Sequence, residues 1–119
     1  MPKIVVWNVE ELPENFSNRL ADKLIGLVCD RLRVAPLWVE VVFVPVVKAV
    51  NIDALNIEIV YSVTDRLHPT QSTVDSLAQD IVQMVRVMSD LPETVTQVTC
   101  WIMPQTNTSF CSEEVDPQK

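Results

Sequence analysis

The chain has 119 residues, a net charge of −7 at pH 7 and an apolar fraction of 48%. This length favours a single domain, and this apolar fraction is high enough to form a buried core. The negative charge argues against a protein that binds nucleic acid or an anionic membrane surface through phosphate groups.

The first half of the chain predicts a strand, a helix and a second strand. Residues 3–9 form an apolar run directly after Pro2, and residues 38–46 form another. Between them, residues 14–33 carry apolar side chains at three- and four-residue steps, which is typical of one face of an amphipathic helix.

The second half predicts the same three elements. Residues 56–63 and 95–103 are β-type runs, and residues 72–88 have the helical period. Ser72 and Asp75 resemble a capping box, so we expect this helix to begin at Ser72.

The two halves match in detail. Pro36 and Pro92 each follow a helix, and they are separated by as many positions as Val39 and Val95. A duplicated β-α-β unit is the best interpretation, with repeats at about 2–47 and 55–104. Right-handed crossovers then give an α+β fold, a four-stranded mixed sheet with both helices on one face. We expect one domain over 2–111 and a flexible acidic tail over 112–119.

The opposite face of this sheet has no helix left to cover it. Residues 39–47 are apolar at almost every position, as in strands that are covered on both faces. We therefore expect a homo-oligomer in which the sheets face inward.

Cysteine and histidine usage bears on the cell compartment and on metal binding. Cys29, Cys100 and Cys111 have no CxxC spacing, which favours free thiols in a reducing cytoplasm. No secretory signal is visible, and the longest apolar stretch, 39–47, is too short to span a membrane. His68 is the only histidine, so we expect no metal site and no cofactor.

Several segments resemble the tautomerase superfamily, which includes oxalocrotonate tautomerase and macrophage migration inhibitory factor. They are the start Met1-Pro2-Lys3-Ile4-Val5-Val6, the helix end Asp30-Arg31-Leu32-Arg33-Val34-Ala35-Pro36 and the duplicated order. The stretch from Met103 to Phe110 is similar to the tail of an uncharacterised branch of this superfamily. The resemblance covers about residues 2–110. It implies a homotrimer with an active site near each amino-terminal proline, and a small carboxylate-bearing substrate.

Pro2 is the catalytic candidate that this resemblance implies. Removal of Met1 would free a secondary amine, and a plain α-amino group titrates at about 8. Apolar neighbours such as Val5 and Trp7 would lower that pKa, so the amine could act as a general base. The implied activity is that of a tautomerase-like isomerase, which moves a proton between carbon and oxygen of a small carbonyl acid. The alternatives are a strand-start proline without chemistry and a non-catalytic homotrimeric interaction or scaffold protein.

Arg66 and His68 are substrate-binding candidates in the loop before the second helix. In the family, arginines in this loop often hold a substrate carboxylate, which a guanidinium suits because its fork matches two oxygens. The alternative for Arg66 is a surface ion pair, and for His68 an exposed loop side chain or a local cap. In the first half, Glu10 and Glu11 stand where many relatives carry arginine, which argues against a dicarboxylate substrate.

Trp101 and Phe110 are the aromatic candidates for the substrate pocket. They resemble aromatic positions near the family's pocket, some of which come from a neighbouring chain. The alternative for both is packing in the core or in an interface.

Overall fold

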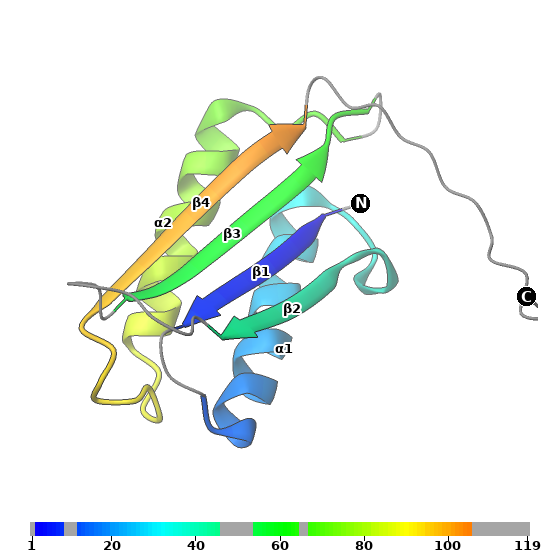
Figure 1. Cartoon of the computed structure of the whole chain (residues 1–119). Coiled ribbons are helices and arrows are strands. Elements are labelled where there is room, and N and C mark those ends of the chain that lie inside the picture. The colour runs from blue at the N-terminus through cyan, green and yellow to red at the C-terminus, as the bar shows by residue number, and fades with distance from the viewer. Residues whose placement is uncertain (1, 9–11, 46–53, 65–66, 106–119) are drawn as a thin grey trace, which may run out of the picture.

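The helices and strands follow the predicted order (Figure 1). The computed structural model describes residues 2–8, 12–45, 54–64 and 67–105. Its elements are β1 (Lys3–Asn8), α1 (Glu14–Leu32), the 3-10 turn η1 (Pro36–Trp38), β2 (Glu40–Pro45), β3 (Ala54–Ser62), α2 (Gln71–Arg86) and β4 (Gln97–Gln105). The expected tail over 112–119 lies outside the described residues.

The four strands form one mixed sheet in the order β2-β1-β3-β4. β1 runs parallel to β2, β3 runs parallel to β4, and β1 and β3 pair antiparallel in the middle. Both helices lie against the same face of the sheet, as Figure 1 shows. The predicted α+β class, with two β-α-β units and two helices on one face, is therefore confirmed.

The two helices bury equivalent stripes of side chains. α1 contributes Leu20, Leu24 and Val28, and α2 contributes residues at the same spacing; all are fully buried. The α2 set is Leu77, Ile81 and Val85. These stripes pack on the helix-facing side of β1 and β3, so one hydrophobic core joins both halves.

Equivalent proline turns carry the chain from each helix region to the following strand. The N–H of Val39 donates to the carbonyl oxygen of Pro36 (3.1 Å), and the N–H of Val95 donates to that of Pro92 (3.0 Å). The fixed φ of proline favours such turns and prevents continuation of a helix. The duplication thus extends to the backbone hydrogen bonds.

The predicted start of α2 was wrong. The N-cap is Thr70, whose hydroxyl accepts a hydrogen bond from the N–H of Thr73 (3.2 Å). Asp75 instead accepts a hydrogen bond from the side-chain amide of Gln71 (2.8 Å). Several hydroxyl-bearing residues lie near the start of this helix, and each has a side chain that can cap a helix. The spacing of Ser72 and Asp75 was therefore not enough to identify Thr70 as the N-cap.

The side of the sheet that faces away from the helices is termed the open face. Its residues alternate with the core residues along each strand, and many are large and apolar. They include Lys3, Val5, Trp7, Val42, Val44, Asn56, Glu58, Val60, Trp101 and Met103. In the described part of the chain no further helix covers this face.

Candidate active site

A hollow of about 470 Å³ lies at the end of the sheet where β1 and β2 begin and β3 ends. It is lined by residues from the start of β1, from the connection between α1 and β2, and from the segment that follows β3. The lining residues are Pro2, Arg33, Val34, Ala35, Trp38, Thr64 and Leu67.

Pro2 is buried at this hollow. Its carbonyl oxygen accepts a hydrogen bond from the N–H of Glu40 (3.3 Å), which adds Pro2 to the parallel pairing of β1 with β2. Because proline has no N–H to donate, its nitrogen takes no part in sheet hydrogen bonding. Pro2 is thus held in the sheet through its carbonyl oxygen alone.

Arg33 lines the hollow, and it also lines a second hollow between the end of α1 and the first turns of α2. It ends α1 in the left-handed conformation (φ 56, ψ 50), and no other described non-glycine residue has a positive φ. This reversal turns the chain so that Val34 and Ala35 also line the hollow. Arg33 is the only charged residue among the described residues that line the hollow with Pro2. The sequence analysis assigns no role to Arg33 beyond its place in the helix end Asp30–Pro36, which is a usable signal.

Trp38 supplies an aromatic wall. It lies in η1, where its N–H donates to the carbonyl oxygen of Ala35 (3.0 Å), and 55% of its surface is exposed. The apolar pattern predicts Trp38 only as the start of the strand 38–46. The apolar run that begins at Trp38 does not show whether the Trp38 side chain lies at the hollow or in the sheet.

The segment after β3 closes on itself beside the hollow. Backbone hydrogen bonds join Thr64 and Leu67 in both directions (2.9 and 3.2 Å). The N–H of Leu67 also donates to the hydroxyl of Thr64 (3.0 Å). Leu67 is consequently buried and presents an apolar side chain to the hollow.

The predicted site residues are only partly brought together. Pro2 lines the hollow, whereas His68, next to Leu67, is exposed and does not. Trp101 lies on the open face opposite Glu58, is 60% exposed and does not line the hollow of its own chain. Arg66 and Phe110 lie outside the described residues.

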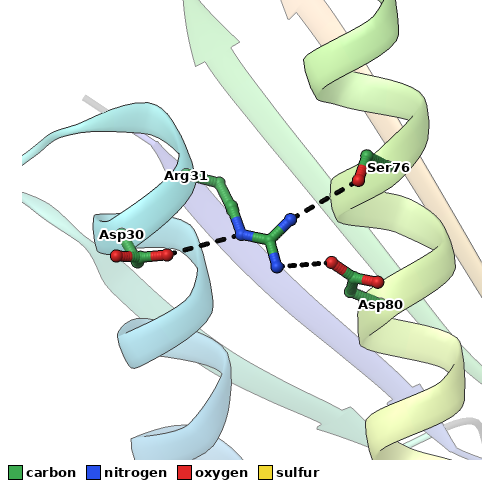
Figure 2. A network of polar contacts seen from close by, with 4 residues as sticks. All are labelled: Asp30, Arg31, Ser76 and Asp80. Carbon is green, nitrogen blue, oxygen red and sulfur yellow. Dashed lines mark hydrogen bonds and ion pairs between the residues drawn. The ribbon is translucent and has the colours of Figure 1, made fainter.

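A polar network fixes the end of α1 next to the hollow (Figure 2). The Arg31 guanidinium forms ion pairs with Asp80 of α2 (2.6 Å) and with Asp30 (3.4 Å), and it donates to the Ser76 hydroxyl (3.4 Å). It therefore ties the last turn of α1 to the middle of α2. Arg33 follows this anchored turn, so its backbone position depends on it.

The described cysteines add no reactive thiol to the hollow, and the described residues form no metal site. Cys29 and Cys100 are free, and burial raises the pKa of the Cys100 thiol to about 12, which makes it a poor nucleophile at neutral pH. Within the ranges that the structure describes, no three His, Cys, Asp or Glu side chains gather as a metal site. None of the described helices has the length and apolar character needed to cross a membrane.

Comparison with known proteins finds similarity in structure and not in sequence. No family model and no curated protein matches the chain. A macrophage migration inhibitory factor-like protein from Entamoeba histolytica superposes with a TM-score of 0.66 at 10% identity, covering 94% of this chain and 95% of that one. Pt0534, solved after inactivation by 2-oxo-3-pentynoate, gives 0.61 at 14% identity and 91% coverage of both chains. A fused 4-OT that forms an asymmetric trimer gives 0.63 at 13% identity, also with 91% of both chains.

The chain therefore has the tautomerase-superfamily fold, as the resemblance in its sequence implied. The similarity extends over nearly the whole length of both chains in each comparison, so it includes both β-α-β units.

Proposed function

We propose that this protein is a tautomerase-like isomerase in which Pro2 acts as a general base on a small carbonyl acid. The observation that carries the proposal is the position of Pro2, buried in a hollow whose lining includes one cation, Arg33. Removal of Met1 is required, because only then is the Pro2 nitrogen a basic amine.

The surroundings of Pro2 suit a base that is uncharged near neutral pH. Burial among apolar side chains disfavours the protonated amine, and the guanidinium of Arg33 disfavours it further. Both effects lower the pKa of a freed Pro2 amine from its ordinary value. A base with a pKa near the working pH is the most effective in proton transfer.

The proposed reaction moves one proton from carbon to oxygen. The Pro2 nitrogen takes the proton from the carbon next to the substrate carbonyl, and the electron pair of that C–H bond forms the enolate. Arg33 holds the substrate carboxylate or steadies the enolate oxygen by charge-assisted hydrogen bonds. The protonated Pro2 then gives its proton to the oxygen, which yields the enol and restores the free amine.

A homotrimer is part of the proposal. The open face of the sheet, with Trp101 and Met103 exposed on it, would be covered by neighbouring copies. The fused 4-OT is a trimer of the same fold, which supports this arrangement. Trp101 and Phe110 are then proposed to reach a neighbour's hollow, and Arg66 and His68 to assist in substrate binding. The free thiols support a cytoplasmic location.

A non-catalytic homotrimer of the same fold is the second candidate. The exposed apolar side chains on the open face favour self-association whether or not Pro2 is reactive. Retention of Met1 would favour this candidate, since the Pro2 nitrogen would then be an amide.

Mass spectrometry and turnover separate the two candidates. We expect the mature protein to lack Met1 and to be labelled at Pro2 by 2-oxo-3-pentynoate. We also expect Pro2→Ala to lower the ketonisation rate of phenylenolpyruvate by at least about 100-fold, the usual size of a general-base contribution. Pro92→Ala is the matched control, because Pro92 occupies the equivalent turn of the second β-α-β unit and lies outside the lining residues. Equal rates in wild type and Pro2→Ala would contradict the mechanism, and a monomer in light scattering would contradict the trimer.

A further inference from the structure

We propose that Arg31, which does not line the hollow at Pro2, is a positioning residue for that hollow: it fixes the separation of the segments that line it and keeps Arg33 directed toward Pro2. This inference deepens the proposed function and rests on it. It follows from the contacts of the Arg31 guanidinium and from the helices that these contacts join (Figure 2).

The lining of the Pro2 hollow comes mainly from two segments, and each is continuous with one helix. The residues from Arg33 to Trp38 follow α1 directly, whereas Thr64 and Leu67 lie in the segment that leads into α2. A change in the distance between the last turn of α1 and α2 therefore moves the two segments relative to each other. The width of the hollow thus depends on how the two helices are joined at this end of the sheet.

Arg31 makes the polar connection between the two helices. Its Nη2 lies 2.6 Å from the Asp80 carboxylate and its Nη1 lies 3.4 Å from the Ser76 hydroxyl, and these two residues are one turn apart on α2. Within the described ranges, no other side-chain hydrogen bond or ion pair joins α1 directly to α2. Since a planar guanidinium donates in fixed directions, α1 cannot shift along α2 without breaking these contacts.

Arg31 also pairs with a carboxylate that would otherwise attract Arg33. Asp30 lines the second hollow together with Arg33, and its carboxylate lies 3.4 Å from Nε of Arg31. Arg33 itself has no ion pair with a described residue. Without Arg31, the charge of Asp30 would draw the Arg33 guanidinium toward the second hollow and away from Pro2. Arg31 therefore favours the position of Arg33 at Pro2.

Both effects of Arg31 act on the Pro2 amine. A wider hollow admits water, and a displaced Arg33 no longer disfavours the protonated amine. Loss of Arg31 should therefore raise the pKa of the freed Pro2 amine toward its ordinary value of about 8. Less of the amine is then uncharged at neutral pH. Arg31 thus acts on the reactivity of Pro2 through other residues, without lining the hollow itself.

Arg19 provides a matched control on the same helix. Its guanidinium pairs with Asp90 at 2.8 Å, and Asp90 lies in the turn that follows α2. Arg19→Met and Arg31→Met each remove one arginine of α1 and its ion pairs, but only Arg31 is next to the Pro2 hollow. A general loss of stability would affect both variants, whereas a positioning effect should be confined to Arg31→Met.

The first measurement is the rate at which 2-oxo-3-pentynoate labels Pro2 in the full chain, followed by mass spectrometry across pH. We expect Arg31→Met to raise the pH midpoint of labelling by about one unit and to slow labelling at pH 7 about tenfold. Asp80→Asn should act in the same direction, and the double variant should add little, because both changes remove one contact. Arg31→Lys should recover part of the rate, and Arg19→Met should match wild type.

The second measurement is amide hydrogen exchange, which does not require a reactive Pro2. The N–H groups of Trp38 and Leu67 are hydrogen-bonded within the two lining segments (3.0 and 3.2 Å). Relative to amides of β1 and β3, Arg31→Met should speed the exchange of both groups about threefold or more. Arg19→Met should leave this ratio unchanged.

The two measurements separate this inference from the proposed function. If wild type is labelled at Pro2 but Arg31→Met keeps the wild-type midpoint, or responds no more than Arg19→Met, the inference is wrong and the catalytic proposal stands. If wild type is not labelled, the catalytic proposal fails and the exchange of Trp38 and Leu67 decides alone. Unchanged exchange of these two amides in Arg31→Met would then overturn the role of Arg31, and faster exchange would support it.

Discussion

Replacing Arg33 by glycine should stabilise the protein, although it removes the charge from the candidate site. Arg33 holds a left-handed backbone (φ 56, ψ 50), which costs a residue with a side chain roughly 1–2 kcal/mol. Glycine avoids this cost, but its greater freedom in the unfolded chain offsets about 0.5–1 kcal/mol. No residue in the described ranges pairs with the Arg33 side chain, so its loss should cost little. We expect a net gain of about 0.5 kcal/mol in the free energy of unfolding.

Arg33→Ala isolates the backbone contribution. Alanine removes the guanidinium but keeps the left-handed strain, so we expect it to be less stable than Arg33→Gly by about 1 kcal/mol. Urea unfolding at one fixed protein concentration measures both variants, because assembly makes the apparent stability depend on concentration. At Gln83, an exposed position inside α2, the order should reverse, with glycine about 1 kcal/mol below alanine. Greater stability of Arg33→Ala than of Arg33→Gly would refute the reasoning.

Three further changes test other parts of the structure. Gly26→Ala should add about 1 kcal/mol in urea unfolding, because Gly26 lies inside α1 and an added Cβ would meet no atom within 4 Å. A double-mutant cycle on Arg31 and Asp80 should give a coupling energy of about 0.5–1 kcal/mol that shrinks in 1 M salt; no coupling would mean that the ion pair does not join the helices. Above pH 9.0 an unfolded Cys100 ionises while the folded thiol stays protonated up to about 12. Stability should therefore fall by about 1.4 kcal/mol per pH unit in that window, and Cys100→Ala should lack this component.

The fold was predictable because its signals are periodic and repeated. Apolar steps such as Leu20, Leu24 and Val28 identify the buried face of α1, and the repeat in α2 identifies its partner. Pro36 and Pro92 mark equivalent turns, so one unit supports the assignment of the other. Such patterns depend on many residues at once. A wrong assignment of one residue therefore does not change the predicted element.

The candidate site was less predictable because it depends on single residues. Arg33 and Trp38 reach the hollow through a left-handed residue and a short 3-10 turn, neither of which has a period in the sequence. The family resemblance directed attention to Trp101, which the structure places on the open face. Pro2 was found because its position at the start of a strand is itself the signal.

Glu58 has a consequence for what can cover the open face. It lies in the middle of the sheet, opposite Val5 on one side and Trp101 on the other. Any protein that covers these strands must place a hydrogen-bond donor or a cation next to Glu58. Otherwise the Glu58 carboxylate is buried without a partner in an interface that excludes water. The Glu58 carboxylate thus makes binding to the open face selective. It disfavours purely apolar partners and favours a partner that carries a complementary donor or cation.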